Sequence, residues 1–355
     1  MAKTKSLNEA VSQELKSKFD LGKFKDKKML NQNVKFKTQM WIPVSQALQD
    51  VISLPGIPMG HITLLRGHSD TGKTTALIEA AVSAQKRGIL PVLIITEMKF
   101  DFSHLKTMGF EVKEVVDEST GEITNYEGFF IYADRSTLQS VEDVSAFILD
   151  LMDEQKKGNL PYDLLFLWDS IGSIPCKLSL ESNKNNNEWN AGAMSQQFGN
   201  FVNQKIVLSR KENYPYTNTL LAVNKVWVEK PAMPMEQPKM KNKGGNTMYF
   251  DASLVVTFGN IANASTNKIK AVKNGKEVEF AKRTKVSIDK NHITGISTKG
   301  SVIMTPHGFI ADDKNKKALE QYKKDHSEEW VTVLGSGTFD VIEEDTIEDV
   351  ATTED

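Results

Sequence analysis

Residues Gly67 to Thr74 read GHSDTGKT and supply the residue types and spacing that bind the phosphates of a nucleotide. Glycines in a turn let successive backbone N–H groups point inward around phosphate oxygens, which bulkier residues would obstruct. At this spacing Lys73 can reach the β- and γ-phosphates, and the Thr74 hydroxyl can hold Mg²⁺. The residues expected to contact the nucleotide are Gly67, His68, Ser69, Asp70, Thr71, Gly72, Lys73, Thr74 and Thr75. The sequence therefore predicts a triphosphate site; the alternative is a glycine turn that matches by chance.

The segments on either side of this loop have the order needed to present it. An apolar run at 61–66 predicts a buried strand, and residues 75–87 carry apolar side chains at helical spacing. A helix that begins directly after the loop points its N-terminal N–H groups at the phosphates. This order of strand, loop and helix favours the nucleotide site over the chance match.

Two carboxylates follow later apolar segments. Glu97 comes directly after a predicted strand at 91–96, and Asp169 ends the apolar segment 163–168. Because ligands bind at the carboxyl ends of parallel strands, Glu97 is placed to polarise a water against the γ-phosphate. Asp169 is placed to help hold Mg²⁺. The alternative for Glu97 is a structural ion pair.

The order of the apolar segments predicts the fold class. Strands are expected at 61–66, 91–96, 128–133, 163–168 and 219–223, with a helix at 141–154. Strands that are apolar throughout and alternate with helices indicate an α/β protein with a mainly parallel sheet covered on both faces. Further strands at 253–258, 285–288 and 301–305 predict an antiparallel extension, and 117–124 predicts a hairpin insertion.

Residues 225–245 form a basic segment without strand periodicity, holding five lysines, two acids, one tryptophan and three prolines. Cations and an aromatic side chain can grip a phosphate backbone and stack on bases, and a loop this long is often functional. We predict a DNA-binding loop here; a solvated loop is the alternative. Its candidate contacts are Lys225, Trp227, Lys230, Lys239, Lys241, Lys243, Gly244 and Gly245. A second polar loop, near 177–192, is expected to leave the same edge of the sheet and to line the DNA.

The chain's net charge of −2 conceals two ends of opposite sign. Residues 1–40 hold ten lysines and four acids, and residues 338–355 hold eight acids and no base. Basic and acidic ends suggest contact with a polyanion and its regulation, although solvated, disordered ends are the alternative for the tail. The single cysteine, Cys176, excludes an internal disulfide, and no membrane span or signal peptide is visible, so a cytoplasmic setting is expected.

Four stretches, in this order, resemble the RecA-type recombinases: Gly56–Gly67, Glu97–Gly109, Trp168–Pro175 and Lys243–Ser253. The similarity extends over about residues 40–305. It implies a RecA-type P-loop ATPase core that uses ATP and Mg²⁺. The acidic tail and the short segment after Gly308 look more like phage-encoded recombinases of the UvsX type, in which case the location would be the host cytoplasm.

The resemblance also implies roles for individual residues. Glu97 would be the base that activates water, while Asp101 and His104 would lie against the adenine. Asn224 would sense the γ-phosphate; beside it the bacterial family commonly has Gln where this chain has Lys225, a cation that could contact that phosphate directly. Lys290 would stabilise charge at the ATP of the neighbouring subunit.

The resemblance implies three regions and a set of partners. Residues 1–41 would form a basic arm that docks on the next subunit, 42–310 the ATPase core, and 311–355 a short helix and an acidic tail. For residues 6–19 of the arm, a helix packed on its own core is the alternative. The expected partners are single- and double-stranded DNA, further copies of the chain in a helical filament, a loading mediator and a single-strand-binding protein. The alternatives are a ring-forming helicase motor and a filament mediator that binds nucleotide without hydrolysing it.

Overall fold

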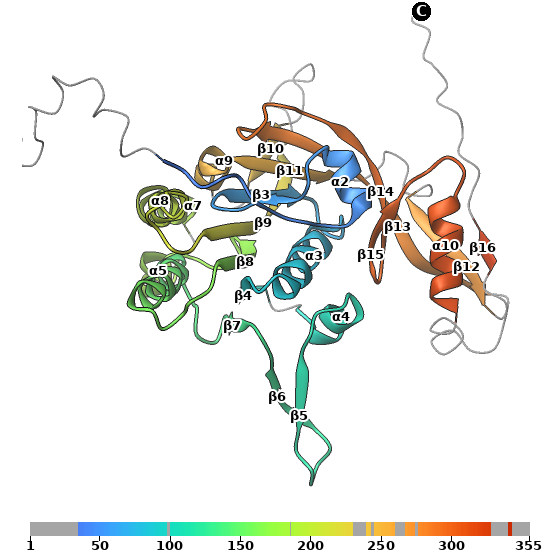
Figure 1. Ribbon diagram of the computed structural model, residues 1–355, viewed down its shortest axis with the longest axis horizontal. Coiled ribbons are helices and arrows are strands. Elements are labelled where there is room, and N and C mark those ends of the chain that lie inside the picture. Colours follow the sequence, from blue (N-terminus) through green and yellow to red (C-terminus); the bar gives the residue numbers. More distant parts are fainter. Residues whose placement is uncertain are drawn as a thin grey trace, which may run out of the picture.

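The computed structural model describes residues 35–97, 100–184, 186–229, 239–242, 245–259, 267–273, 276–327 and 340–342. The predicted helix at 6–19 and most of the acidic tail lie outside these residues. The described chain is an α/β fold in which helices cover both faces of one large mixed sheet (Figure 1). Within the described residues, none of the helices has the length and apolar character to cross a membrane.

Six neighbouring strands of this sheet are parallel, in the order β7–β4–β8–β9–β3–β11. Three antiparallel strands, β13, β14 and β15, continue the sheet beyond β11. The bounds are β3 (Ile62–Gly67), β4 (Leu90–Ile95), β7 (Ile131–Asp134), β8 (Leu164–Ile171), β9 (Asn218–Glu229), β11 (Leu254–Gly259), β13 (Lys276–Asn291), β14 (Lys299–Thr305) and β15 (Gly308–Ala311). The predicted parallel sheet with an antiparallel extension is confirmed.

Two apolar cores lie on the two faces of the sheet. Helices α2 (Gln46–Ile52) and α3 (Lys73–Lys86) pack on one face, while α5 (Val141–Lys157), α7 (Asn187–Met194), the π-helical turn η2 (Ser195–Val202) and α8 (Asn203–Leu208) pack on the other (Figure 1). Successive residues of β9 alternate between these cores: Leu221 and Val223 face α3, and Leu220 and Ala222 face α5. This alternation decides which β9 side chains reach the phosphate loop.

A smaller third core lies at the C-terminal end of the described chain. Strand β12 (Lys268–Lys273) pairs with β13 and with β16 (Asp340–Ile342), and helix α10 (Lys317–Asp325) covers them. The predicted hairpin insertion is also present, as β5 (Lys113–Val116) and β6 (Ile123–Glu127), and it projects away from the sheet (Figure 1). The Tyr126 ring at its base stacks on Phe102 of α4 (Phe102–Thr107), with ring centroids 4.1 Å apart.

The two segments predicted as DNA loops contain regular structure. Residues 177–192, expected as a loop, are mostly helical, in α6 (Lys177–Glu181) and α7. Asn186 caps α7 by accepting hydrogen bonds from the backbone N–H groups of Glu188 and Trp189. In 225–245, strand β9 continues to Glu229 and pairs antiparallel with β10 (Lys239–Asn242). The loop prediction was wrong for these parts, and the connection at 230–238 lies outside the described residues.

The N-terminal part of the described chain contacts its own core. Residues 35–40 make an isolated bridge from Phe36 to Lys211, and Lys37 donates its backbone N–H to the carbonyl of Arg210 at 2.8 Å. The regular pairing comes just after it, between β1 (Trp41–Ile42) and β2 (Ile57–Pro58). Docking of residues 1–41 on a neighbouring subunit remains a prediction.

Candidate nucleotide-binding site

The phosphate loop connects β3 directly to α3, as the sequence predicts. Gly67 ends β3 beside Phe258 of β11, and a Cβ added at Gly67 would lie 2.0 Å from the Phe258 carbonyl oxygen. Gly72 has a φ of +93°, a left-handed conformation that favours glycine, and it is the N-cap residue of α3. Gly67 is therefore required by the close approach of β11, and Gly72 by the left-handed backbone at the start of α3.

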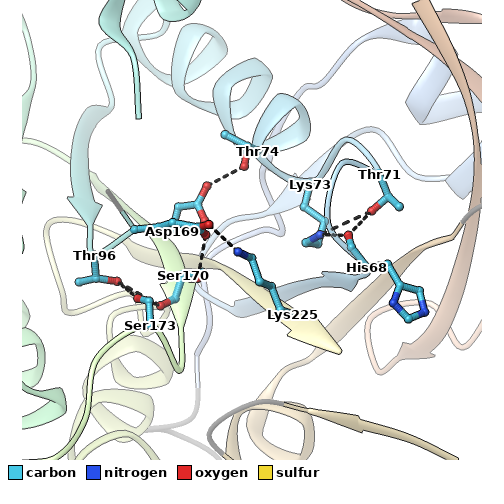
Figure 2. Close-up of polar contacts among 10 residues, drawn as sticks. His68, Thr71, Lys73, Thr74, Thr96, Asp169, Ser170, Ser173 and Lys225 are labelled. Atoms are coloured by element: carbon cyan, nitrogen blue, oxygen red, sulfur yellow. Dashed lines mark hydrogen bonds and ion pairs between the residues drawn. The ribbon is translucent and has the colours of Figure 1, made fainter. Parts of the chain in front are cut away.

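Lys73 is the buried cation of the loop, with 5% of its surface exposed. Its ammonium donates to the carbonyl oxygen of His68 and lies 3.5 Å from the Thr71 hydroxyl, which itself donates to the same carbonyl (Figure 2). Burial lowers the pKa of Lys73 from 10.5 to about 8, with Asp169 acting in the opposite direction. The carboxylates of Asp169, Glu97 and Asp70 offset part of this shift, and a bound phosphate would add further negative charge beside the ammonium.

Thr74 and Asp169 bring two oxygen ligands together from α3 and β8. The Thr74 hydroxyl donates to the Asp169 carboxylate at 2.7 Å (Figure 2). Burial raises the pKa of Asp169, and the hydrogen bond from Thr74 opposes that shift. Hydroxyl and carboxylate oxygens are the ligands that Mg²⁺ prefers, so this pair fits the predicted metal site.

Glu97 lies beside Asp169 because β4 and β8 are neighbouring parallel strands. Its backbone N–H donates to the Asp169 carbonyl at 3.1 Å. One carboxylate oxygen of Glu97 pairs with the ammonium of Lys225, and the other accepts from the Ser170 hydroxyl at 3.3 Å. The residue predicted to activate water is therefore held by a cation and a hydroxyl.

These groups line one cavity of about 340 Å³ at the carboxyl edge of the sheet. Its lining residues are Ser69, Asp70, Lys73, Thr74, Ile95, Glu97, Phe100, His104, Asp169, Val223 and Lys225. His104 is the one adenine candidate among them, and burial lowers its pKa. Asp101 is not a lining residue; its carboxylate instead caps α4, accepting from the Ser103 backbone N–H at 2.8 Å.

Asn224 and Lys290, also predicted to act at ATP, lie elsewhere in this subunit. Asn224 follows the strand alternation onto the α5 face; it is 1% exposed, and its side-chain oxygen has no hydrogen-bond partner within the described part of the chain. The Lys290 ammonium donates to the carbonyl oxygens of Tyr249 (3.2 Å) and Phe250 (2.5 Å) in α9 (Thr247–Asp251). Phosphate sensing by Asn224 and action of Lys290 on a neighbouring subunit stay predictions.

The predicted DNA contacts are divided between the cavity and the β9–β10 hairpin. Lys225 points into the cavity, opposite Gly67 in strand register (Figure 2). Trp227 in β9 is paired with Lys241 of β10, and Lys239 is paired with Glu229. Gly245 has a φ of +90° and leads into α9, while Lys230, Lys243 and Gly244 lie outside the described residues. The hairpin pairing begins at Val226, one residue beyond the cavity residue Lys225.

Sequence reasoning did not single out Ser170 or Phe100 as site residues. Ser170 directly follows Asp169, so its position beside the metal candidate was available, but its hydrogen bond to Glu97 depends on the pairing of β4 with β8. The Thr96 hydroxyl, which accepts from the buried Trp168 indole at 3.0 Å, belongs to the same support. These bonds fix the strand ends that carry Glu97 and Asp169, and Figure 2 shows Thr96 and Ser170 beside Asp169.

No protein-family model matches the chain. Curated proteins that it resembles are Protein RecA of Sulfurovum sp. (strain NBC37-1), 21% identical over 249 residues, and Protein RecA of Mesomycoplasma hyopneumoniae (strain J), 23% identical over 284 residues. The matches cover 70% and 78% of this chain. The chain is similar to RecA proteins over most of its length. It spans 60% of the Sulfurovum RecA and 74% of the Mesomycoplasma RecA, and the α/β fold with its mainly parallel sheet is consistent with a RecA-type core.

Proposed function

We propose that this protein is an ATP-dependent DNA recombinase that polymerises on single-stranded DNA and catalyses homologous pairing and strand exchange. One observation carries the proposal: the same cavity brings together Lys73, the Thr74–Asp169 pair and the Glu97–Lys225 pair, next to a basic hairpin. The similarity to RecA proteins supports it. The finer assignment to phage-type recombinases of the UvsX kind is part of the proposal.

The residues divide the work of ATP hydrolysis between them. Lys73 and the loop N–H groups bind the β- and γ-phosphates, and Thr74 and Asp169 hold Mg²⁺, which neutralises phosphate charge. Glu97 orients a water in line with the γ-phosphate and accepts its proton. His104 borders the space for the base. Lys290 would act on the ATP of the next subunit, for which its ammonium must leave the α9 carbonyls.

Nucleotide and DNA communicate through β9 in this proposal. The strand runs without interruption from the core through Lys225 to Glu229 in the hairpin. A γ-phosphate contact at Asn224 or Lys225 would therefore order the hairpin that carries Trp227, Lys239 and Lys241, and so favour DNA binding. Neighbouring subunits, a loading mediator and a single-strand-binding protein are the proposed protein partners.

The test measures phosphate release with and without single-stranded DNA, while electron microscopy records filaments. We expect hydrolysis that DNA stimulates and filaments on DNA. Glu97→Gln should hydrolyse ATP about 100-fold more slowly, because the variant lacks the base. Unwinding of a forked duplex without a homologous strand would favour the ring helicase. Negligible hydrolysis by the unmodified protein would favour the non-hydrolysing mediator.

A further inference from the structure

We propose that Glu79 of helix α3 is a positioning residue for nucleotide: it holds strand β15 against the phosphate loop and so keeps the loop shaped for phosphate before any nucleotide binds. This inference rests on the proposed function, because it concerns the same ATP site. It goes further by assigning part of the affinity of that site to a carboxylate that is not among the residues lining the cavity.

The first argument is the position of the Glu79 carboxylate at the junction of three elements. One of its oxygens accepts from the backbone N–H of Phe309 in β15 at 2.8 Å. The other accepts from the backbone N–H of Ser45, the N-cap residue of α2, at 3.0 Å. Burial raises the pKa of Glu79, and the two N–H donors oppose this shift because they favour the ionised form. One carboxylate therefore fastens both α2 and β15 to α3, which lies alongside β15 (Figure 1).

The second argument is the close approach of the β15 backbone to this carboxylate. Gly308 directly precedes Phe309 and has a φ of +117°, in the region that favours glycine. A Cβ added at Gly308 would lie 2.8 Å from the same Glu79 oxygen that accepts the Phe309 bond. A side chain at this position would force the strand and the carboxylate apart. The start of β15 is therefore fitted to Glu79.

The third argument is the contact that Phe309 makes with the phosphate loop. Its ring lies against Gly72, where an added Cβ would be 2.8 Å from a ring carbon. The same ring stacks on Phe258, with centroids 6.1 Å apart, and the Phe258 carbonyl is the group that meets Gly67. The two glycine ends of the loop therefore rest on a stacked pair of aromatic residues. Glu79 fixes the backbone of one member of that pair.

The consequence is a loop that is organised in advance. A site that already has its bound shape loses no affinity to ordering. Without the Glu79 acceptor the Phe309 N–H is left unpaired, and β15 can move away from Gly72. Part of the binding energy of the nucleotide would then go into ordering the loop, whereas the bound state and its rate of hydrolysis would be unchanged. ADP and ATP should lose affinity equally, because both bind the loop through their β-phosphates.

A matched pair of methionine substitutions tests this role. E79M removes both acceptor oxygens from α3. Q155M removes a buried polar group from α5 at the other end of the sheet, where Gln155 donates to the Tyr162 carbonyl at 2.7 Å and to the Asn218 side chain at 3.0 Å. Calorimetry measures the affinities for ADP and for a non-hydrolysable β,γ-imido analogue of ATP, and phosphate release gives KM and kcat. E79M should lower both affinities and raise KM about tenfold with kcat unchanged, whereas Q155M should lower only the stability toward urea.

A double-mutant cycle separates the contact with the loop from the other bonds of Glu79. F309A keeps the backbone N–H but removes the ring that lies against Gly72, so it should lower both affinities by a similar factor. In the F309A background E79M should add little further loss, because both residues act through the same contact. E79Q retains one acceptor oxygen and should give an intermediate loss, which decides the question if E79M does not fold.

Three results would overturn the inference. The first is an E79M protein that binds nucleotide as tightly as the unmodified protein. The second is an equal loss of affinity in Q155M, because general destabilisation would then explain both. The third is full additivity of E79M and F309A, which would show that Glu79 does not act through Phe309. Failure of the unmodified protein to bind either nucleotide would instead refute the proposed function.

Discussion

The depressed pKa of Lys73 predicts that nucleotide binding takes up a proton near pH 8. Burial lowers this pKa from 10.5 to about 8, and a bound phosphate, by its negative charge, should return it toward the ordinary value. At about pH 8 half of the free protein molecules carry a neutral Lys73. Each nucleotide that binds should then take up roughly 0.5 proton at that residue.

The sign of the pH dependence follows from the same shift. The protonated lysine is the form that binds phosphate, so affinity is greatest below about pH 8 and decreases above it. Between about pH 7 and pH 9 the protonated fraction of Lys73 falls roughly tenfold, and the affinity for nucleotide should fall by the same factor. The terminal phosphate also loses its last proton near neutral pH, so the comparison with a Lys73→Arg variant isolates the part of the effect that belongs to Lys73.

Calorimetry measures this proton uptake directly. The heat of binding of a non-hydrolysable β,γ-imido analogue of ATP is measured at pH 8 in two buffers that differ in ionisation enthalpy. The difference between the two heats gives the number of protons exchanged. Lys73→Arg is the matched control, because its guanidinium stays protonated throughout this range and should eliminate the uptake. Absence of proton uptake in the unmodified protein, or equal uptake in both proteins, would refute the assignment to Lys73.

Three other substitutions test the support of the site. Gly67→Ala adds a Cβ 2.0 Å from a backbone oxygen, so it should lower the free energy of unfolding by about 1–3 kcal/mol and abolish nucleotide binding. Gly259→Ala is the control, because its added Cβ meets nothing within 4 Å and should have neither effect. Chemical denaturation measures the stability of both variants, and calorimetry measures their nucleotide binding. Asp169→Asn should raise the Mg²⁺ concentration that gives half-maximal hydrolysis by about 10–100-fold. A titration of hydrolysis against Mg²⁺ that matches the unmodified protein would contradict the metal role. Trp168→Phe removes the buried bond to Thr96 and should cost about 2 kcal/mol of stability in urea; an unshifted midpoint would count against that bond.

Much of the fold was predictable because its signals are local. The apolar strands that became β3, β4 and β8 are continuous runs, and the helical spacing after Gly72 predicted α3. Strand β7 was displaced: it was expected at 128–133, and the structure places it at Ile131–Asp134. Alternation cannot fix the ends of a strand when the flanking residues are also apolar.

The polar segments were the harder part. Residues 177–192 have a composition that is typical of loops, yet the Asn186 cap and the packing of Met194 in the α5-side core stabilise α7. Strand β9 extends past Lys225 because β10 supplies backbone partners for it. The paired residues flank the polar, proline-containing connection at 230–238, so the local composition predicts a loop although the two flanking segments pair as strands.

The sequence alone determined the chemistry that is available: a phosphate loop with Lys73 and Thr74, and carboxylates at the ends of two predicted strands. Only the tertiary structure decided how these groups meet. The order β4–β8–β9–β3 places Glu97 beside Asp169 and brings Lys225 to both. Adjacent residues of a strand face opposite sides, so the sequence allows either Asn224 or Lys225 to face the phosphate loop. The packing of β9 between its two cores places Lys225 in the cavity beside that loop.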